Sequence, residues 1–136
     1  MATKSIEDLF KTDSSLETEG IEIKYGEHGS FFIARAGGAN KAFNALMTKK
    51  LRPYRTAMQM GTMDDSVLES VVRECFAEKV VLGWDLVDSE GNAIPFSKQK
   101  CVELFNNLPD LFTDLMQESQ RVANFVQSAR EEDAKN

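Results

Sequence analysis

Apolar residues in the first twenty positions are sparse, and their spacing indicates one short helix. Ile6, Leu9 and Phe10 recur at intervals of three and four, so they share one face of a helical turn or two. The next segment, residues 11–20, is polar and carries no periodic apolar pattern, which predicts a loop. We therefore expect little regular structure before residue 20.

An alternating pattern follows and predicts a β-hairpin. Ile21, Ile23 and Tyr25 alternate with charged residues, and residues 29–35 are rich in aromatic and β-branched side chains. The segment between them, residues 26–29, begins and ends with glycine, as tight turns often require. A lone hairpin is only marginally stable in water, so this one must pack against helices.

Helical spacing governs the rest of the chain. The expected helices begin after Asn40, follow the apolar stripe Val67–Val81, start after the N-cap Ser97, and run from Pro109 to about Ala129. Pro53 ends or kinks the first of them. The predicted fold class is mainly α, a small helical domain of about four helices with one N-terminal β-hairpin.

The only tryptophan, Trp84, follows Gly83 at the point where the second long helix must turn back towards the next. An indole ring there can bury roughly 200 Å² and fix the angle between two helices. We interpret Trp84 as a structural anchor. A partner-binding aromatic is the alternative.

Length and composition favour one soluble domain. We expect residues 1–136 to form a single unit, with flexible ends at 1–19 and 130–136. The longest apolar run is far too short to cross a bilayer, and no secretory signal opens the chain. These features predict a cytoplasmic protein that does not bind membranes.

Candidate chemistry is scarce. The cysteines Cys75 and Cys101 lie inside apolar helical patterns and are expected to be buried, free thiols. The single histidine, His28, lies in the expected turn, where no nucleophile motif or metal-ligand spacing surrounds it. We therefore predict no catalytic residue, no metal site and no cofactor, and a protein that is not an enzyme.

Charge is distributed unevenly along this chain of net charge −6. The segment 35–55 contains no acidic residue and carries the six basic residues Arg35, Lys41, Lys49, Lys50, Arg52 and Arg55. The segment either is a solvated helix whose basic end complements the macrodipole, or attracts acidic partners, including other copies of the chain. Nucleic acid is disfavoured, because the flanking segments are acidic and would repel phosphate.

Three methionines follow the basic segment, at Met58, Met60 and Met63. Methionines in such a cluster either fill gaps in a core or form an adaptable apolar surface for varied helices. Together with the six basic residues, they form the candidate surface for a partner or for self-association.

Four runs of sequence carry a resemblance to a known family. They are IARAGGANKAF (33–43), RPY (52–54), VVLGWDLVDSEGNAIPFS (80–97) and NLPDLF (107–112). In this order they resemble the tail assembly chaperones of long non-contractile-tailed, lambda-like bacteriophages, over roughly residues 5–125.

The resemblance implies a function without catalysis. Such proteins coat the aggregation-prone tape measure protein in the host bacterial cytoplasm, self-associate, and are absent from the finished virion. Many also have a longer form, made by a programmed frameshift, that recruits the tail tube protein. Two alternatives stay open, namely a structural tail component of the virion and a small nucleic-acid-binding protein with a basic patch.

Overall fold

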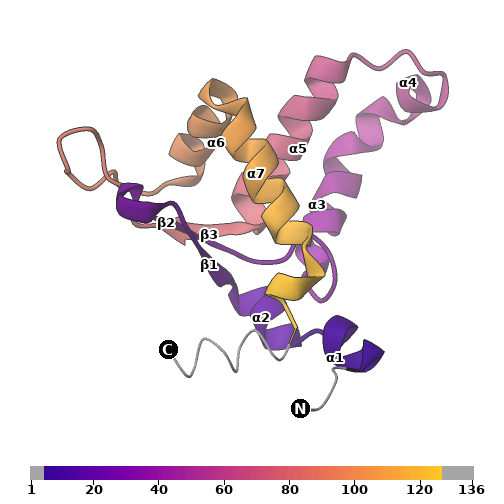
Figure 1. Ribbon diagram of the computed structural model, residues 1–136. Helices are drawn as coiled ribbons and strands as arrows, with labels where there is room; N and C mark the ends of the chain where they lie inside the picture. Colours follow the sequence, from indigo (N-terminus) through magenta and orange to yellow (C-terminus); the bar gives the residue numbers. More distant parts are fainter. Residues whose placement is uncertain (1–4, 127–136) are drawn as a thin grey trace.

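The computed structural model describes residues 5–126, which form helices, a small sheet and short 3₁₀ turns (Figure 1). The α-helices are α1 (Ile6–Phe10), α2 (Ser14–Glu19), α3 (Lys41–Leu51), α4 (Arg55–Gln59), α5 (Asp65–Lys79), α6 (Lys98–Asn107) and α7 (Pro109–Gln120). The strands are β1 (Ile21–Lys24), β2 (Ser30–Ile33) and β3 (Val81–Trp84), and the 3₁₀ turns are η1 (Gly26–His28), η2 (Arg52–Tyr54) and η3 (Val122–Asn124).

The predicted hairpin is part of a larger sheet. Strands β1 and β2 pair as expected, but β2 also pairs with β3, which gives a three-stranded antiparallel sheet in the order β1-β2-β3. Phe31 stands opposite Ile23 on one side and Trp84 on the other. The prediction of about four helices with one N-terminal β-hairpin is therefore wrong. The fold mixes a sheet with more helices than the apolar pattern indicated.

Strand β3 lies where the sequence predicted the end of a helix and a turn. Helix α5 ends at Lys79, so the stripe Val67–Val81 is helical only in part. Val81 and Trp84 face the core, whereas Leu82 between them is 43% exposed. Two buried residues three positions apart in a run of four do not distinguish a strand from the last turn of a helix. Pairing with β2, a partner some fifty residues earlier, decides the conformation.

Two further helices differ from their predicted extents. Residues 14–19, expected as loop, form α2, whose N-cap Asp13 accepts a hydrogen bond from the Ser15 amide. Helix α7 begins at Pro109 as predicted but ends at Gln120, where Arg121 is extended and the Asn124 side-chain Nδ2 donates to the Glu118 backbone carbonyl. The remainder of the predicted last helix, from residue 127, and the predicted flexible end at 130–136 lie outside the described residues.

One face of the sheet packs against α5, α6 and α7 and forms the core. Aromatic rings connect its layers: Phe76 of α5 contacts the rings of Phe43, Phe105 and Phe112. The buried core residues are Phe31, Ile33, Phe43, Val71, Cys75, Phe76, Ala77, Val80, Val81, Trp84, Cys101, Phe105 and Leu115. The opposite sheet face exposes Phe32 and Leu82. The predicted burial of both thiols is confirmed.

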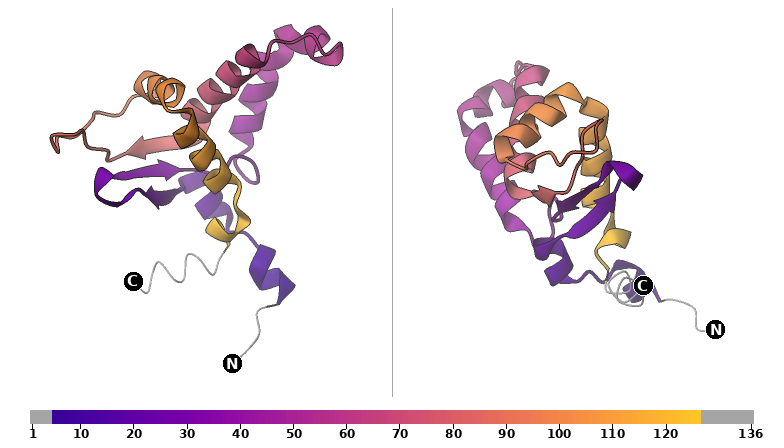
Figure 2. Two further views of the ribbon diagram at one scale, coloured as in Figure 1. Left: turned by 45° about the horizontal axis from the view of Figure 1, so that its top comes forward. Right: turned by 90° about the vertical axis from the view of Figure 1, so that its left-hand side faces the viewer.

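Helices α3 and α5 pack side by side and extend away from the sheet as an arm, with α4 at its tip (Figure 2). Pro53 lies in η2, where its missing amide hydrogen ends α3 and permits the bend into α4. The predicted break at Pro53 is confirmed. The part of the basic segment from Lys41 to Arg55 therefore lies on a projecting element rather than on the body of the fold.

Trp84 lies at the end of β3 rather than between two helices. Its indole Nε1 donates to the Ile94 carbonyl oxygen at 2.7 Å, and its ring packs edge-on against Phe31 and Phe96. The side chain is 9% exposed. Trp84 thus links β3 to the loop that returns to α6.

Replacing Trp84 with phenylalanine is expected to lower the free energy of unfolding by about 1–3 kcal/mol, because a partly buried carbonyl loses its donor and the smaller ring leaves a void. Urea denaturation followed by circular dichroism measures the change. Tyr54→Phe is the control: Tyr54 is 38% exposed, and its substitution should cost less than about 0.5 kcal/mol. Equal losses in the two variants would contradict the anchoring role.

Candidate functional site

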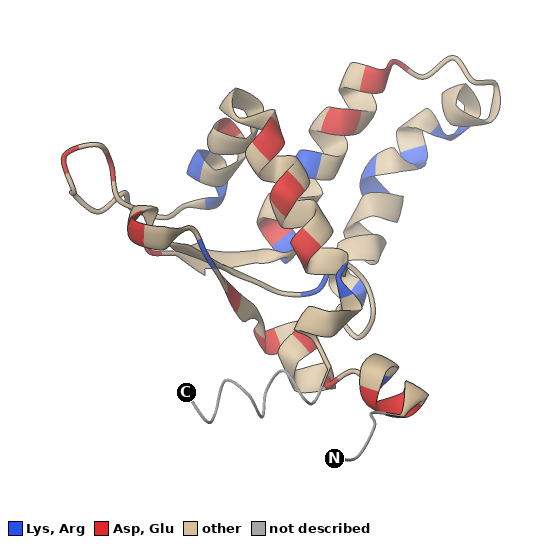
Figure 3. Cartoon of the chain, viewed as in Figure 1, with Lys and Arg blue, Asp and Glu red and all other residues tan. Residues whose placement is uncertain are grey.

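Four of the six basic residues form an exposed stripe on the arm. Lys41, Lys49, Arg52 and Arg55 are all exposed. Lys41 and Arg52 are separated by about three helical turns, so their side chains leave α3 in similar directions. Figure 3 shows this concentration of positive charge on α3 and α4, whereas acidic residues predominate on α5 and α7.

The structure removes Arg35 and Lys50 from this free stripe. The Arg35 guanidinium forms a 3.2 Å ion pair with Glu17 of α2 and lies 5.9 Å from the centre of the Phe125 ring. The Lys50 ammonium lies 3.3 Å from Glu74 of α5, so it joins the two helices of the arm. These two cations are paired within the fold, so the available surface is smaller than the sequence indicated.

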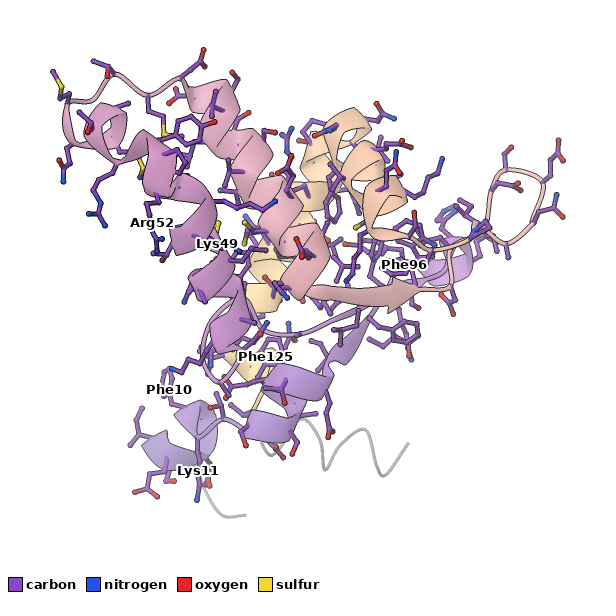
Figure 4. The ribbon with its side chains drawn as sticks, turned by 180° about the vertical axis from the view of Figure 1, so that it is seen from behind. Phe10, Lys11, Lys49, Arg52, Phe96 and Phe125 are labelled. Carbon is purple, nitrogen blue, oxygen red and sulfur yellow. The ribbon has the colours of Figure 1, made fainter. Side chains whose placement is uncertain are left out.

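A shallow groove of about 300 Å³ runs along the bend between α3 and α4. Its apolar floor comes from Leu51 and Met58, and Arg52 and Arg55 supply positive charge. Its lining residues are Thr48, Leu51, Arg52, Arg55, Met58 and Gln59. Figure 4 shows the side chain of Arg52 on the outer side of the arm, with Lys49 nearby on α3. An apolar floor between exposed cations suits an amphipathic segment with acidic residues.

The methionines lie at the tip of the arm. Met58 is 44% exposed, Met60 is 71% exposed, and Met63 is half-buried. The interpretation that all three fill core gaps therefore does not hold for Met58 and Met60. Methionine is flexible and polarisable, so exposed methionines beside a groove adapt to apolar side chains of varied shape.

Sequence reasoning missed Thr48, Leu51 and Gln59 as lining residues. With Arg52, Arg55 and Met58, they recur every three or four positions, which places all six on one helical face. That spacing was available in the sequence. It was hidden because Pro53 interrupts the helix, and only the geometry of η2 shows that the face continues from α3 into α4.

The two cysteines are buried and the single histidine is exposed. Burial raises the pKa of the Cys101 thiol to about 12 and also raises that of Cys75, so both remain protonated apolar side chains. His28 is exposed in η1. Within residues 5–126, no group of His, Cys, Asp and Glu side chains gathers as metal ligands, and no helix is long and apolar enough to span a membrane.

Comparison with known families identifies the origin of the chain. The model of the YdaY prophage protein family matches residues 38–136, which include the whole arm and most of the core. The chain belongs to this family. Membership in the YdaY family shows a phage-derived protein, and the tail-assembly role remains a prediction. No solved structure matches the chain.

Proposed function

We propose that this YdaY-family protein is a tail assembly chaperone, which binds the tape measure protein in the host bacterial cytoplasm and is not retained in the mature virion. Its phage origin and the resemblance of its four sequence runs to tail assembly chaperones support the proposal. The function involves binding without catalysis. A longer, frameshifted form would recruit the tail tube protein.

The observation that carries the proposal is the exposed groove on the arm, with methionines at its end. A tape measure protein is a long helical chain whose apolar faces aggregate when they are left bare. An amphipathic helix binds a groove by placing apolar side chains on its floor, and cations at the rim favour acidic residues beside them. The groove offers both features on an element that projects from the body.

Two other functions compete with this one. A structural tail component would be present in purified virions, where mass spectrometry would detect it in stoichiometric amounts. A nucleic-acid-binding protein would use the same basic stripe, with an affinity that falls steeply as salt rises. The net charge of −6 and the small number of free cations favour a protein partner over nucleic acid.

Reversing the charge of the groove is expected to abolish protection of the client. In the variant Arg52→Glu/Arg55→Glu, the rim repels the acidic client residues that the two arginines attract. Co-expression with the tape measure protein of the same prophage measures the effect. We expect the soluble fraction of the client to fall at least about tenfold relative to wild type.

The matched control is Lys24→Glu/Lys100→Glu, which changes the net charge equally at exposed positions away from the arm. It should solubilise the client as wild type does. A client that stays insoluble with the wild-type protein, or that is rescued equally by both double variants, would refute the proposed binding surface.

A further inference from the structure

Helix α1 exposes an apolar face that nothing in the described residues covers. Ile6 is 69% exposed, Leu9 49% and Phe10 61%. Their spacing puts all three on one side of the helix. The helix is nevertheless well defined at its start, because Ser5 and Asp8 form a capping box in which each side chain accepts a hydrogen bond from the other residue's amide.

Helix α1 also carries negative charge. Glu7 and Asp8 are exposed in its first turn, next to the apolar face. Helix α1 is therefore a preformed segment with apolar and acidic side chains, which is the kind of ligand that the groove on the arm can bind. Within residues 5–126, neither Arg52 nor Arg55 forms an ion pair, so both cations are available to carboxylates from outside.

Helix α1 cannot reach the groove of its own chain. It is held at its place by the segment that follows it, since Thr12 pairs with Val126 and the Asp13 amide donates to the Phe125 carbonyl at 2.8 Å. Helices α1 and α4 lie at opposite ends of the molecule (Figures 1 and 2). In Figure 4, Phe10 and Lys11 lie at the other end of the molecule from Arg52. Only another molecule can bring an α1 to this groove.

We propose that the groove between α3 and α4 binds helix α1 of a second copy of this chain. Leu9 and Phe10 lie on the floor formed by Leu51 and Met58, and Glu7 lies close to the arginines at the rim. Each contact buries apolar surface and pairs opposite charges that are exposed in the single chain.

The contact is head-to-tail, because the two surfaces that meet are different. A pair joined in this way still offers one free α1, on one copy, and one free groove, on the other, so association continues into a ring or an open chain of copies. An acidic amphipathic helix of a client would occupy the same groove and displace α1. This last step rests on the proposed function, whereas the self-association does not.

Sedimentation velocity of the full chain over a range of concentrations tests the contact. The wild-type protein should form species larger than a dimer, and Leu9→Ser/Phe10→Ser should raise the dissociation constant at least about tenfold through the loss of two apolar side chains. Arg52→Glu/Arg55→Glu should have a similar effect. Phe32→Ser/Leu82→Ser is the matched control, since it removes a comparable exposed pair from the outer sheet face and should associate normally.

Mixing Leu9→Ser/Phe10→Ser with Arg52→Glu/Arg55→Glu tests directly whether α1 of one copy binds the groove of another. One retains an intact groove and the other an intact α1, so together they should form a one-to-one dimer that grows no further. Two variants that remain monomeric in the mixture would overturn the head-to-tail contact. So would a wild-type protein that is monomeric at all concentrations, or one that associates equally well with either change.

The outcome also separates this inference from the proposed function. A chain that stays monomeric yet solubilises the client through Arg52 and Arg55 would refute self-association through α1 and leave the client site standing. A chain that forms head-to-tail assemblies but does not bind the client would refute the chaperone proposal alone.

Discussion

Replacing Phe76 with alanine is expected to lower the free energy of unfolding by about 3–5 kcal/mol. Phe76 is fully buried, and its ring lies 5.3–6.3 Å from the centres of the Phe43, Phe105 and Phe112 rings. The substitution leaves a cavity where α3, α5, α6 and α7 meet, and the surrounding rings can collapse into it only in part. A loss of this size is a large part of the total free energy of unfolding of a small domain.

Urea denaturation at pH 7, followed by circular dichroism at 222 nm, would measure the effect. Phe32→Ala is the matched control, because it deletes the same ring from a position that is 38% exposed on the outer face of the sheet. It should cost less than about 1.5 kcal/mol. A Phe76→Ala protein as stable as the control would contradict the described core.

Replacing Glu17 with alanine is expected to cost about 2–3 kcal/mol, because it breaks a buried charge cluster between α2 and the loop after β2. Glu17 is 3% exposed, and its Oε2 accepts hydrogen bonds from Arg35 at 3.2 Å and from the Ala39 amide at 2.9 Å. Arg35 keeps partial exposure and can rehydrate, which places the loss below that of a fully buried pair.

Gly38→Ala tests the same cluster by changing a residue that contacts the Glu17 carboxylate. Gly38 has φ +56°, and a Cβ atom there would lie within 1.7 Å of the Glu17 carboxylate oxygen. The substitution must displace the Glu17 side chain and also strains the backbone, so a loss of about 2 kcal/mol is expected. Gly37→Ala is a useful comparison, since it shares a positive φ but has open space around its Cβ. A loss of no more than about 1 kcal/mol at Gly38, the cost of the left-handed backbone alone, would show that the clash with Glu17 does not destabilise the fold.

The contribution of Glu17 should depend on pH. Desolvation by burial raises its pKa, but hydrogen bonds from Thr12, Ala39 and Arg35 outweigh it and hold the pKa below the usual 4.5. The folded protein therefore favours the carboxylate. Stability from this group is fully present above about pH 4.5 and is lost as the pH falls through the lower folded pKa.

Denaturation of wild type and Glu17→Gln between pH 3 and pH 7 measures this component. Glutamine keeps the size of the side chain but cannot titrate, so the difference in free energy of unfolding should be constant above about pH 4.5 and shrink below it. A difference that stays the same at pH 3 and at pH 7 would show that the charge of Glu17 does not stabilise the fold.

Local signals predicted several elements correctly. The hairpin turn, the start of α6 at Ser97, the start of α7 at Pro109 and the break at Pro53 all depend on residues that act on their immediate neighbours. Ser97 accepts a hydrogen bond from the Lys100 amide, as its sequence position indicated. Such caps and breaks need no distant partner, so sequence spacing is sufficient to predict them.

Elements that depend on distant partners were missed. Strand β3 exists because β2 offers it a free edge, and α2 forms where buried Glu17 reaches Arg35 and Ala39. The local composition of residues 11–20 does not predict a helix, and that of Val81–Trp84 does not predict a strand. Tertiary context therefore decided between loop and helix in one case, and between helix and strand in the other.

The sequence by itself determined that a basic segment and three methionines follow one another along the chain, and that a phage-derived chain carries them. Only the tertiary structure decided which cations are free. Arg35 and Lys50 are held by acidic residues from α2 and α5, whereas Arg52 and Arg55 flank a groove. The physical reason is that an ion pair requires two charges within a few ångströms, and the fold, rather than spacing along the chain, brings Glu17 and Glu74 to those distances.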